Sequence, residues 1–515
     1  MHASMRYFKR IAPIVVGLLL GCNGGSEPAP AADGSATAAA SQAMVPPTTS
    51  VTSTADAVRA TIEALRRDDA RSDAAAAAFK PPPSTAKDPG PRNGLPSAGA
   101  PLAGLSKPYL DAFTVGKADF EEAELPDEGL GPTMNLDSCG GCHSQPAMGG
   151  SSPAVNPQFA FATAMGAKNK VPSFITANGP VREARFVRNA DGSPDGGVHG
   201  LFTITGRSDA GADCTVPQPD FAAQVARNNV VFRILTPLFG AGLIEAIPDR
   251  EILQNQARAG EAKRALGIRG RPNVLLTANS ISGQPNKNGN DGTVGRFGHK
   301  AQNKSLLIFA GEAYNVEMGI TNGAFPTERD ETEACMKYAA TPNSDVTLED
   351  GTLPNAAISS IDRFTLFMRL LAPPEPSNAV AGAMPESIAS GRALFADAGC
   401  ALCHTPSLKT YARAAVPSMS NQVVNLYSDL LLHDMGRGLA DGVQQGQAGS
   451  REWRSALLWG LGQRLFFLHD GRTSDLRQAI AEHASEGSEA NGSTRKFFAL
   501  PDAQQQDVLN FLRSL

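Results

Sequence analysis

Apolar residues recur at helical spacing in the C-terminal third of the chain. Pro385, a residue that suits the first turn of a helix, opens a stretch to position 396 that we predict to be helical. Leu476, Ile480 and His483 fall at i, i+4 and i+7, so a helix here would turn the histidine toward the core with the apolar residues. Another helix is predicted over 501–515, with an apolar face of Val508, Leu509, Leu512 and Leu515.

A short apolar run lies near the N-terminus. Residues 11–20 are too few to cross a bilayer, and basic residues at positions 6, 9 and 10 precede them, as in a secretory signal. The run ends in Leu19-Leu20-Gly21-Cys22, which resembles a bacterial lipobox, so we expect removal of 1–21 and acylation of Cys22. Because Asn23 follows rather than aspartate, the expected location is the periplasmic side of the bacterial cell envelope, as an outer-membrane lipoprotein. The alternative is an ordinary secretory signal with an unrelated cysteine.

Residues 22–106 form a low-complexity segment. It is rich in Ala, Ser, Thr, Pro and Gly and lacks the apolar surface to fold alone. One short helix is expected within it, capped by Thr54, with Val58, Ile62 and Leu65 on one face. We predict that the segment is a tether that spaces the folded body from the membrane.

Composition and proline positions divide the rest of the chain. The composition becomes globular from about Pro108, and prolines at 373, 374 and 376 interrupt any continuous helix. We therefore predict an N-terminal domain over 107–375, with loop-rich insertions between 150 and 370, and a C-terminal domain over 376–515. Residues 233–242 and 454–462 both read as an arginine, an apolar run and an aromatic residue before Gly-x-Gly, as a duplicated domain would leave.

The charge balance narrows the class of partner. Apolar residues make up 42% of the chain and charged residues 19%, so most of it can bury a core. The net charge is −5, and loss of residues 1–21 would leave 43 basic against 51 acidic side chains, or −8. A chain without a basic surplus cannot displace counterions from phosphates, which argues against nucleic acid as a partner.

The seven cysteines fall into three groups. Cys22 would carry the lipid, while Cys214 and Cys335 would form a disulfide in an oxidising compartment or remain two free thiols. The others belong to two Cys-x-x-Cys-His motifs, Cys139-Gly140-Gly141-Cys142-His143 and Cys400-Ala401-Leu402-Cys403-His404.

Each Cys-x-x-Cys-His motif is typical of covalent haem attachment. Two thiols on one helical turn can add to the vinyl groups of a haem, which holds the following histidine beneath the iron. We therefore predict two covalently bound haem c groups, with His143 and His404 as proximal ligands. A zinc site would use the same residue types, but a third and fourth ligand at regular spacing are missing.

Six phrases, one of which leads into the first motif, carry a family resemblance: Glu128-Gly129-Leu130-Gly131-Pro132, Asn135-x-x-Ser138-Cys139, Arg296-Phe297-Gly298-His299-Lys300-Ala301, Leu432-His433-Asp434-Met435-Gly436, Glu452-Trp453-Arg454 and Leu468-His469-Asp470-Gly471-Arg472. In combination they resemble the di-haem oxidoreductase, putative peroxidase family, from about Pro108 to Leu515. That family is more distantly similar to bacterial di-haem cytochrome c peroxidases, methylamine-dehydrogenase-maturing enzymes and haem-dependent rubber oxygenases. The resemblance implies a mainly α fold with two cytochrome-c-like haem domains packed together. One residue departs from the pattern, because His299 stands where an arginine or a tryptophan is expected.

For the C-terminal haem we expect His483 as the second axial ligand. In the related peroxidases a distal methionine follows the His-Asp-Gly phrase at a similar distance, so the resemblance favours this position; the alternative is a buried structural histidine. His433 and His469 are expected to hydrogen-bond a propionate or a backbone group rather than to bind iron. Met435 would be either packing or a thioether ligand.

No distal ligand is evident for the N-terminal haem, since Met148 is too close to His143 in sequence to reach the opposite face. His299 is a candidate distal base or ligand, with a structural or surface histidine as the alternative. Glu245 is a candidate acid–base group or a solvated carboxylate.

Trp453 and Trp459 are the only tryptophans, and both lie beside the second haem motif in sequence. We predict Trp459 as the electron relay between the haems, with core packing as the alternative.

These features favour an enzyme. Electrons from a small redox protein or a quinol-linked donor would enter at the C-terminal haem, and the N-terminal haem would activate peroxide or dioxygen. One alternative is a non-catalytic electron carrier in which both haems are six-coordinate. Another is an oxygenase or maturation enzyme that acts on an organic substrate.

Overall fold

The computed structural model describes residues of one compact unit, Ala77–Leu515. Met1–Ala76 lies outside the described residues. The structure describes residues 79–92, 98–131, 134, 136–165, 172, 174–195, 208–209, 218–275, 280–281, 284–285, 293–322, 325 and 359–515. Cys22, the helix expected after Thr54, and the Cys214 and Cys335 pair lie outside these residues, so what we expect of them stays a prediction.

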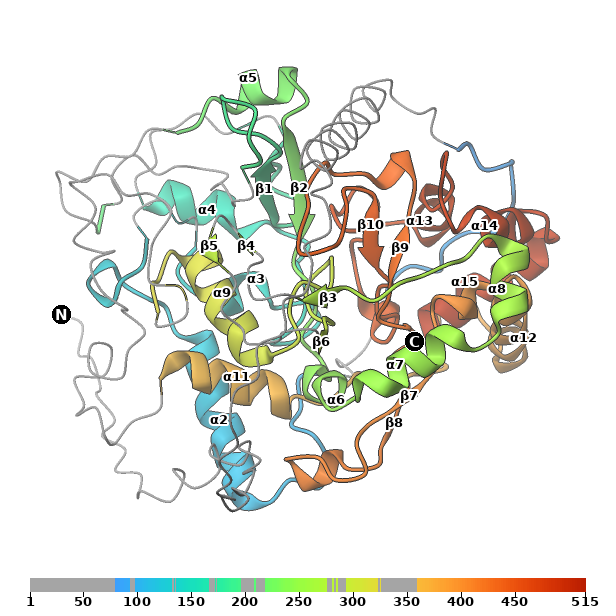
Figure 1. The fold of residues 1–515 in the computed structure, drawn as a ribbon, viewed down its shortest axis with the longest axis horizontal. Helices are drawn as coiled ribbons and strands as arrows, with labels where there is room; N and C mark the ends of the chain where they lie inside the picture. The colour runs from blue at the N-terminus through green and yellow to red at the C-terminus, as the bar shows by residue number, and fades with distance from the viewer. Residues whose placement is uncertain are drawn as a thin grey trace, which may run out of the picture. The chain divides into compact units, whose positions relative to one another are not determined.

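Helices predominate over short antiparallel strand pairs in the described residues, as the sequence predicts (Figure 1). The helices are α2 (Lys107–Glu121), α3 (Cys139–Cys142), α4 (Pro157–Ala164), α5 (Phe221–Ala226), α6 (Ala241–Glu245), α7 (Asp249–Ala257), α8 (Gly260–Leu266), α9 (Leu306–Met318), α11 (Ser360–Leu370), α12 (Pro385–Asp397), α13 (Leu476–Glu482), α14 (Asn491–Phe498) and α15 (Asp502–Ser514). Paired strands are β1 (Arg182–Phe186) with β2 (Val230–Ile234), β3 (Val274–Leu275) with β6 (Thr293–Val294), β4 (Ser280–Ile281) with β5 (Gln284–Pro285), β7 (Leu408–Lys409) with β8 (Val423–Val424), and β9 (Leu432–Asp434) with β10 (Glu452–Arg454). The helices predicted over 385–396, around 476–483 and over 501–515 are confirmed as α12, α13 and α15.

Two helix pairs cross at close range. The α2 helix, which precedes the first cysteine motif, packs on α11, and α12, which precedes the second motif, packs on α15. A glycine lies at each crossing. A Cβ atom on Gly116 would lie 2.2 Å from the Arg363 carbonyl oxygen, and one on Gly391 would lie 1.9 Å from that of Asp507. Both crossings therefore depend on the missing side chain, because it lets two helix backbones touch.

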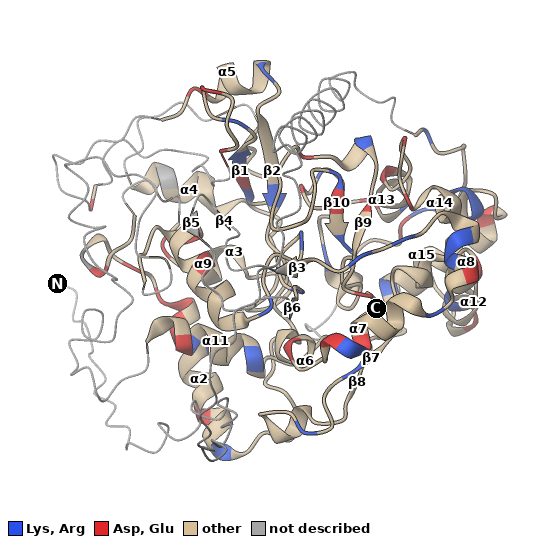
Figure 2. Cartoon of the chain, in the orientation of Figure 1, with Lys and Arg blue, Asp and Glu red and all other residues tan. Residues whose placement is uncertain are grey.

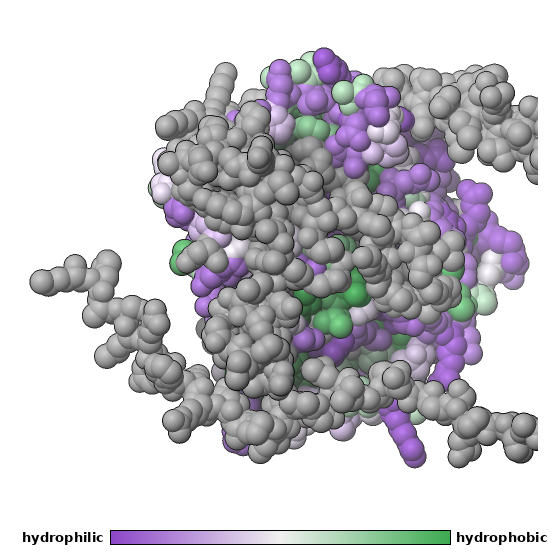
Figure 3. Space-filling model, turned by 60° about the vertical axis from the view of Figure 1, so that its left-hand side comes forward, coloured by the Kyte–Doolittle hydropathy of each residue, from purple (hydrophilic) through white to green (hydrophobic). Residues whose placement is uncertain are grey.

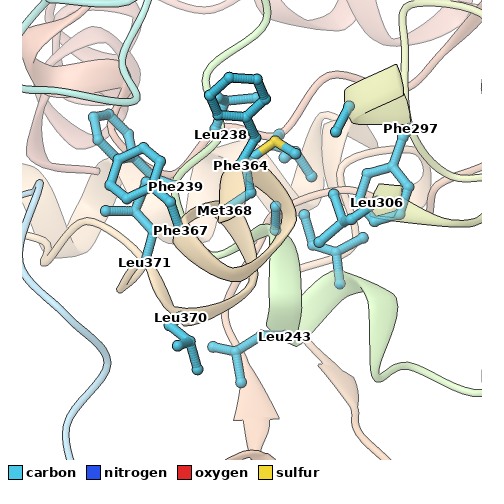
Figure 4. Close-up of a cluster of buried hydrophobic side chains, with 14 of the residues drawn as sticks. Leu238, Phe239, Leu243, Phe297, Leu306, Phe364, Phe367, Met368, Leu370 and Leu371 are labelled. Carbon is cyan, nitrogen blue, oxygen red and sulfur yellow. The ribbon is translucent and has the colours of Figure 1, made fainter. Parts of the chain in front are cut away.

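Each cysteine motif rests on its own hydrophobic cluster. The first cluster gathers α2, α9 and α11, and Figure 4 shows Phe364, Phe367 and Met368 of α11 within it. Cys139 packs against this cluster. The second cluster gathers residues of α12, α13, α14 and α15, and Cys400 packs against it.

Part of the segment predicted as a free tether is instead bound to the folded body. Residues 79–92, here called the strap, lie against the C-terminal helices. The ring centroids of Phe79 and Phe498 are 5.3 Å apart, and the Ser84 hydroxyl donates to Asp502 at 2.7 Å. A stretch so poor in large apolar residues predicts a tether, but polar and backbone hydrogen bonds hold the strap in place. The prediction of a tether that reaches residue 106 was therefore wrong at its C-terminal end.

The described surface carries charges of both signs. Figure 2 shows basic and acidic residues close together along α7 and α8. In the view of Figure 3 the coloured surface is largely hydrophilic, with apolar residues grouped near its middle. Among the described helices, none is long and apolar enough to cross a membrane.

Candidate functional site

The first cysteine motif ends in a buried histidine. The Ser138 hydroxyl accepts the Gly141 N–H at 3.1 Å and begins α3, and the His143 N–H closes the turn on the Cys139 carbonyl at 3.0 Å. His143 Nδ1 lies 2.8 Å from the Gly150 carbonyl, so Nδ1–H donates there and Nε2 carries the lone pair. Burial lowers the pKa of His143, which keeps the ring neutral.

The second motif repeats this arrangement. Gly399, with φ +89°, leads into a turn over Cys400–Leu402, and the His404 N–H bonds with the Cys400 carbonyl at 2.9 Å. His404 Nδ1 lies 3.2 Å from the Tyr427 carbonyl and 3.1 Å from that of Ala456. Its Nε2 is therefore the basic nitrogen, as in His143. Burial raises the pKa of Cys139 and Cys142, and it raises the pKa of Cys400 to about 12, so these thiols stay protonated.

Each motif borders a cavity. The first cavity, of about 80 Å³, is lined by Cys139 and His143 with residues of α2, β1, α9 and α11. The second, of about 260 Å³ and mostly apolar, is lined by Cys400, Cys403 and His404 with residues of α13, α14 and α15. Both share the lining residues Ile234, Leu235, Thr236 and His299, so one wall separates them.

His483 lies across the second cavity from His404, as predicted. Their ring centroids are 6.5 Å apart. Two imidazoles on opposite sides of one metal, each with a metal–nitrogen bond of about 2 Å, have their ring centres about 6 Å apart. His483 Nδ1 lies 2.7 Å from the Ala479 carbonyl of the same helix, which again leaves Nε2 as the basic nitrogen. The pair thus fits a haem iron held from both sides.

Buried arginines also fit a haem in the first cavity. Arg185 and Arg233 line it, and each side chain is at least nine-tenths buried. Nε and Nη1 of Arg185 and Nε of Arg233 have no hydrogen-bond partner within the described residues. Unpaired buried N–H groups are costly, so they suit an anionic group such as a haem propionate. No cluster of three or more His, Cys, Asp or Glu side chains arranged for a bare metal ion occurs in the described part of the chain.

The histidines expected to have non-ligand roles have other partners. His433 lies between two carboxylates, with Nδ1 2.9 Å from Glu489 and Nε2 3.1 Å from Asp429. Burial opposes its charge, but Cys403 and Asp429 raise the pKa of His433 well above its usual value. His469 stacks on Trp453 with ring centroids 3.8 Å apart. Burial, then the charge of Arg472, lower the pKa of His469 far below its usual value.

The two tryptophans lie in different surroundings. Trp453 lines the second cavity, whereas Trp459 lines neither cavity and packs in the first hydrophobic cluster. Trp459 fits against Gly240, where a Cβ atom would lie 2.6 Å from its ring. Trp459 thus occupies the core-packing position given as the alternative to the relay, and Trp453 is the tryptophan that lines a cavity. Sequence distance from the motif could not show which ring reaches the cavity.

His299 lies in the wall that both cavities share. Its Nε2 lies 2.8 Å from the Ile234 carbonyl, and its ring meets Trp453 edge-on at 6.1 Å. Burial, then the charge of Arg233, lower the pKa of His299 to about 3. Such a ring stays neutral and is a weak base, so the position supports a bridging role more than the predicted role of distal base.

Glu245 has structural partners. Its carboxylate pairs with Arg369 at 2.6 Å and accepts the Leu306 N–H at 2.9 Å, at the start of α9. It does not line the first cavity, so its position does not support the acid–base role predicted for it. Three other carboxyls line that cavity and were missed: Glu183, Glu312 and Glu317. The available signal was two glutamates within the largely apolar helix α9.

Burial changes the protonation of these carboxyls. It raises the pKa of Glu312 to about 7, although a hydrogen bond from the Asn303 amide acts in the opposite direction and lowers this pKa. Burial, followed by the neighbouring Glu183 carboxylate, raises the pKa of Glu317 well above its usual value. Titratable groups with such shifts in a cavity are candidates for proton transfer.

Two methionines considered as ligands are also described. Met148 lies against the first motif, where a Cβ atom on Gly140 would be 3.0 Å from its terminal methyl group, and it does not line the first cavity. Met435 lines the second cavity.

The fold and the two sites define a class of protein. It is mainly helical, and each of its two Cys-x-x-Cys-His motifs places a histidine in a cavity. The family described as "Di-haem oxidoreductase, putative peroxidase" matches residues 183–515, and the chain belongs to this family. No curated protein matches the chain.

Solved structures give weak likenesses. One is the diheme peroxidase BthA from Burkholderia thailandensis, with a TM-score of 0.26 and 16% identity over 43% of this chain and 66% of that chain. This chain thus spans just under two thirds of that peroxidase. A single-residue variant of BthA matches with a TM-score of 0.25 and 14% identity, over 54% of this chain and 85% of that one.

Proposed function

We propose that this protein is an exported c-type di-haem oxidoreductase that reduces peroxide, or activates dioxygen, at its N-terminal haem. The observation that carries the proposal is the difference between the two histidine sites. His404 faces His483 at 6.5 Å, which suits a six-coordinate electron-transfer centre. In the described lining of the other cavity, His299 is the one histidine besides His143, and its Nε2 is occupied by the Ile234 carbonyl. An open iron site on the His143 side is thereby favoured.

A c-type attachment is part of the proposal. Haems bound through Cys139 and Cys142, and through Cys400 and Cys403, would supply the redox chemistry and the site at which an oxygen species binds. The thiols of each motif are free in the structure and stand one turn apart, as thioether formation requires. The two helix crossings, α2 with α11 and α12 with α15, support two cytochrome-c-like modules built on the same plan.

The carboxyls of the first cavity would handle protons. Cleavage of a peroxide needs a group that takes a proton from one oxygen and gives it to the other. Glu312, with a pKa of about 7, can hold or release a proton at neutral pH, and Arg185 and Gln302 add donors to the same lining. Glu317 beside Glu183 would keep a proton in reserve.

Electrons would cross the wall between the cavities. His299 and the segment 234–236 line both sides of it, and Trp453 reaches it from the second cavity. We assign the C-terminal haem as the entry point, supplied by a small redox protein or a quinol-linked donor. The signal and lipobox pattern at residues 1–22 support export and lipid anchoring, with the outer membrane of a bacterial cell envelope as the location.

The test uses the full chain, produced in a host that matures c-type cytochromes. We expect a mass gain of two haems, one high-spin and one low-spin ferric signal in electron paramagnetic resonance, and a rapid spectral change with stoichiometric hydrogen peroxide. Two low-spin haems whose spectra do not change with peroxide in any redox state would instead support the non-catalytic electron carrier. Turnover of an organic substrate with dioxygen, and none with peroxide, would favour the oxygenase.

A further inference from the structure

The strap contacts the start of the helix that ends at His483. Asp88 of the strap accepts the Leu476 N–H at 2.9 Å, and Leu476 is the first residue of α13. The same carboxylate forms a fork with Arg513, since Nε and Nη2 each donate at 2.7 Å. Both side chains are buried, with 6% of Asp88 and 1% of Arg513 exposed. A residue far away in sequence therefore fixes one end of α13.

Arg513 carries the link to the wall of the second cavity. Its Nη1 donates to the Leu461 carbonyl at 3.2 Å and to the Arg464 carbonyl at 2.9 Å. Leu461 and Arg464 both line the cavity that holds His404 and His483. Asp88 thus joins α13, α15 and the Leu461–Arg464 turn at one buried point.

The helix is short enough to pass a displacement from one end to the other. It runs from Leu476 to Glu482, seven residues and about two turns, with His483 as its C-cap. Its first N–H groups have no partner within the helix, so they depend on acceptors outside it. Asp475 accepts the Gln478 N–H at 2.7 Å, and Asp88 satisfies Leu476. Loss of the Asp88 acceptor would free the start of α13 and shift its histidine end.

We propose that Asp88 is a positioning residue for His483, through which the strap holds the second axial ligand of the C-terminal haem. The inference rests on the proposed function, because it needs His483 to bind that iron. The strap, despite its tether-like composition, would thus influence the spin state of the C-terminal haem.

The test compares the purified full-length holoprotein with its Asp88→Asn variant. Asparagine keeps the size but replaces one acceptor with an amide that faces the Arg513 donors. We expect a weaker low-spin resonance of the C-terminal haem and a new high-spin component. Added imidazole should bind at least about tenfold more tightly, because the free energy lost with a buried hydrogen bond corresponds to a tenfold change in affinity or more. The Gln506→Ala variant is the control. It removes contacts with the Lys87 backbone in the same strap but none with α13, and should match the wild type.

Two further variants separate the possible failures. His483→Ala must abolish the low-spin signal of the C-terminal haem; if it does not, the ligand assignment in the proposed function fails. If His483→Ala acts but Asp88→Asn leaves spectra and imidazole affinity unchanged, only the positioning role is overturned. Should Asp88→Asn not yield holoprotein, Arg513→Lys carries the test, because it keeps the charge and loses the fork. We expect the same spectral change to a smaller degree, and an unchanged spectrum would overturn the proposal.

Discussion

Trp453 and His469 stack with their ring centroids 3.8 Å apart and their planes within 19° of parallel. The Lys300 ammonium lies 4.0 Å from the Trp453 ring centroid, and the Arg233 guanidinium lies 5.3 Å from it. Positive charge beside an indole opposes the loss of an electron from it, above all where burial reduces screening. The stack therefore suits a bridge for electrons better than a site that stores a tryptophan radical.

The first prediction concerns this bridge. Trp453→Phe removes part of the ring and its Nε1–H hydrogen bond with the Leu439 carbonyl, which is 2.8 Å long in the wild type. We expect severalfold slower electron transfer between the haems, measured by stopped-flow absorbance after one haem is reduced. Trp459→Phe is the matched control. It should lower the free energy of unfolding by about 1–3 kcal/mol, because it leaves a space in the first cluster. The rate of electron transfer between the haems should not change. Equal rates in both variants would rule Trp453 out.

The sequence predicted the parts of the site that depend on local spacing. The two motifs, the helices on either side of the second one, and His483 at i+7 on an amphipathic helix all follow from contacts within a few residues. The structure agrees with the placement of each.

Contacts between distant segments could not be predicted in the same way. Trp453 and Trp459 differ by six positions, and only the fold shows that Trp453 of β10 reaches the cavity while Trp459 packs in the first cluster. Glu245 and Glu312 are both glutamates near apolar residues, but Arg369 neutralises the first and burial governs the second. The strap has the composition of a tether, but residues about 400 positions away hold it in place. The periodicity of apolar residues cannot predict such distant contacts.

The second prediction concerns the axial ligand. In His483→Ala the C-terminal haem should lose its low-spin signal and gain a high-spin one, because His404 alone leaves the sixth site open. Added imidazole should restore the low-spin form by occupying the space of the missing ring. His469→Ala is the control, since His469 lines the same cavity but stacks on Trp453. A low-spin signal that survives in His483→Ala would point to another ligand, with Met435 the next candidate.

The third prediction concerns proton transfer. Glu312→Gln keeps the shape of the side chain and removes its titration. We expect the rate of the reaction with hydrogen peroxide to fall by about 10²–10⁴-fold, the usual contribution of a positioned acid or base. The limb of the pH–rate profile near the Glu312 pKa of about 7 should disappear as well. Glu245→Gln should lower stability by about 1 kcal/mol through its contacts with Arg369 and Leu306 and leave the rate and its pH profile intact.

The last prediction follows from the same carboxyl and concerns stability. The pKa of Glu312 is raised from 4.5 to about 7 in the folded protein. Below pH 4.5 both folded and unfolded chains carry the proton; between 4.5 and 7 the unfolded chain loses it first, so stability falls as pH rises. The full loss, reached above pH 7, corresponds to about 3 kcal/mol. Denaturant unfolding should therefore show that the free energy of unfolding of the wild type falls, relative to that of Glu312→Gln, between pH 5 and pH 8. A difference that stays constant over this range would mean that Glu312 ionises as freely in the folded protein as in the unfolded chain, and its role in proton transfer would fall with it.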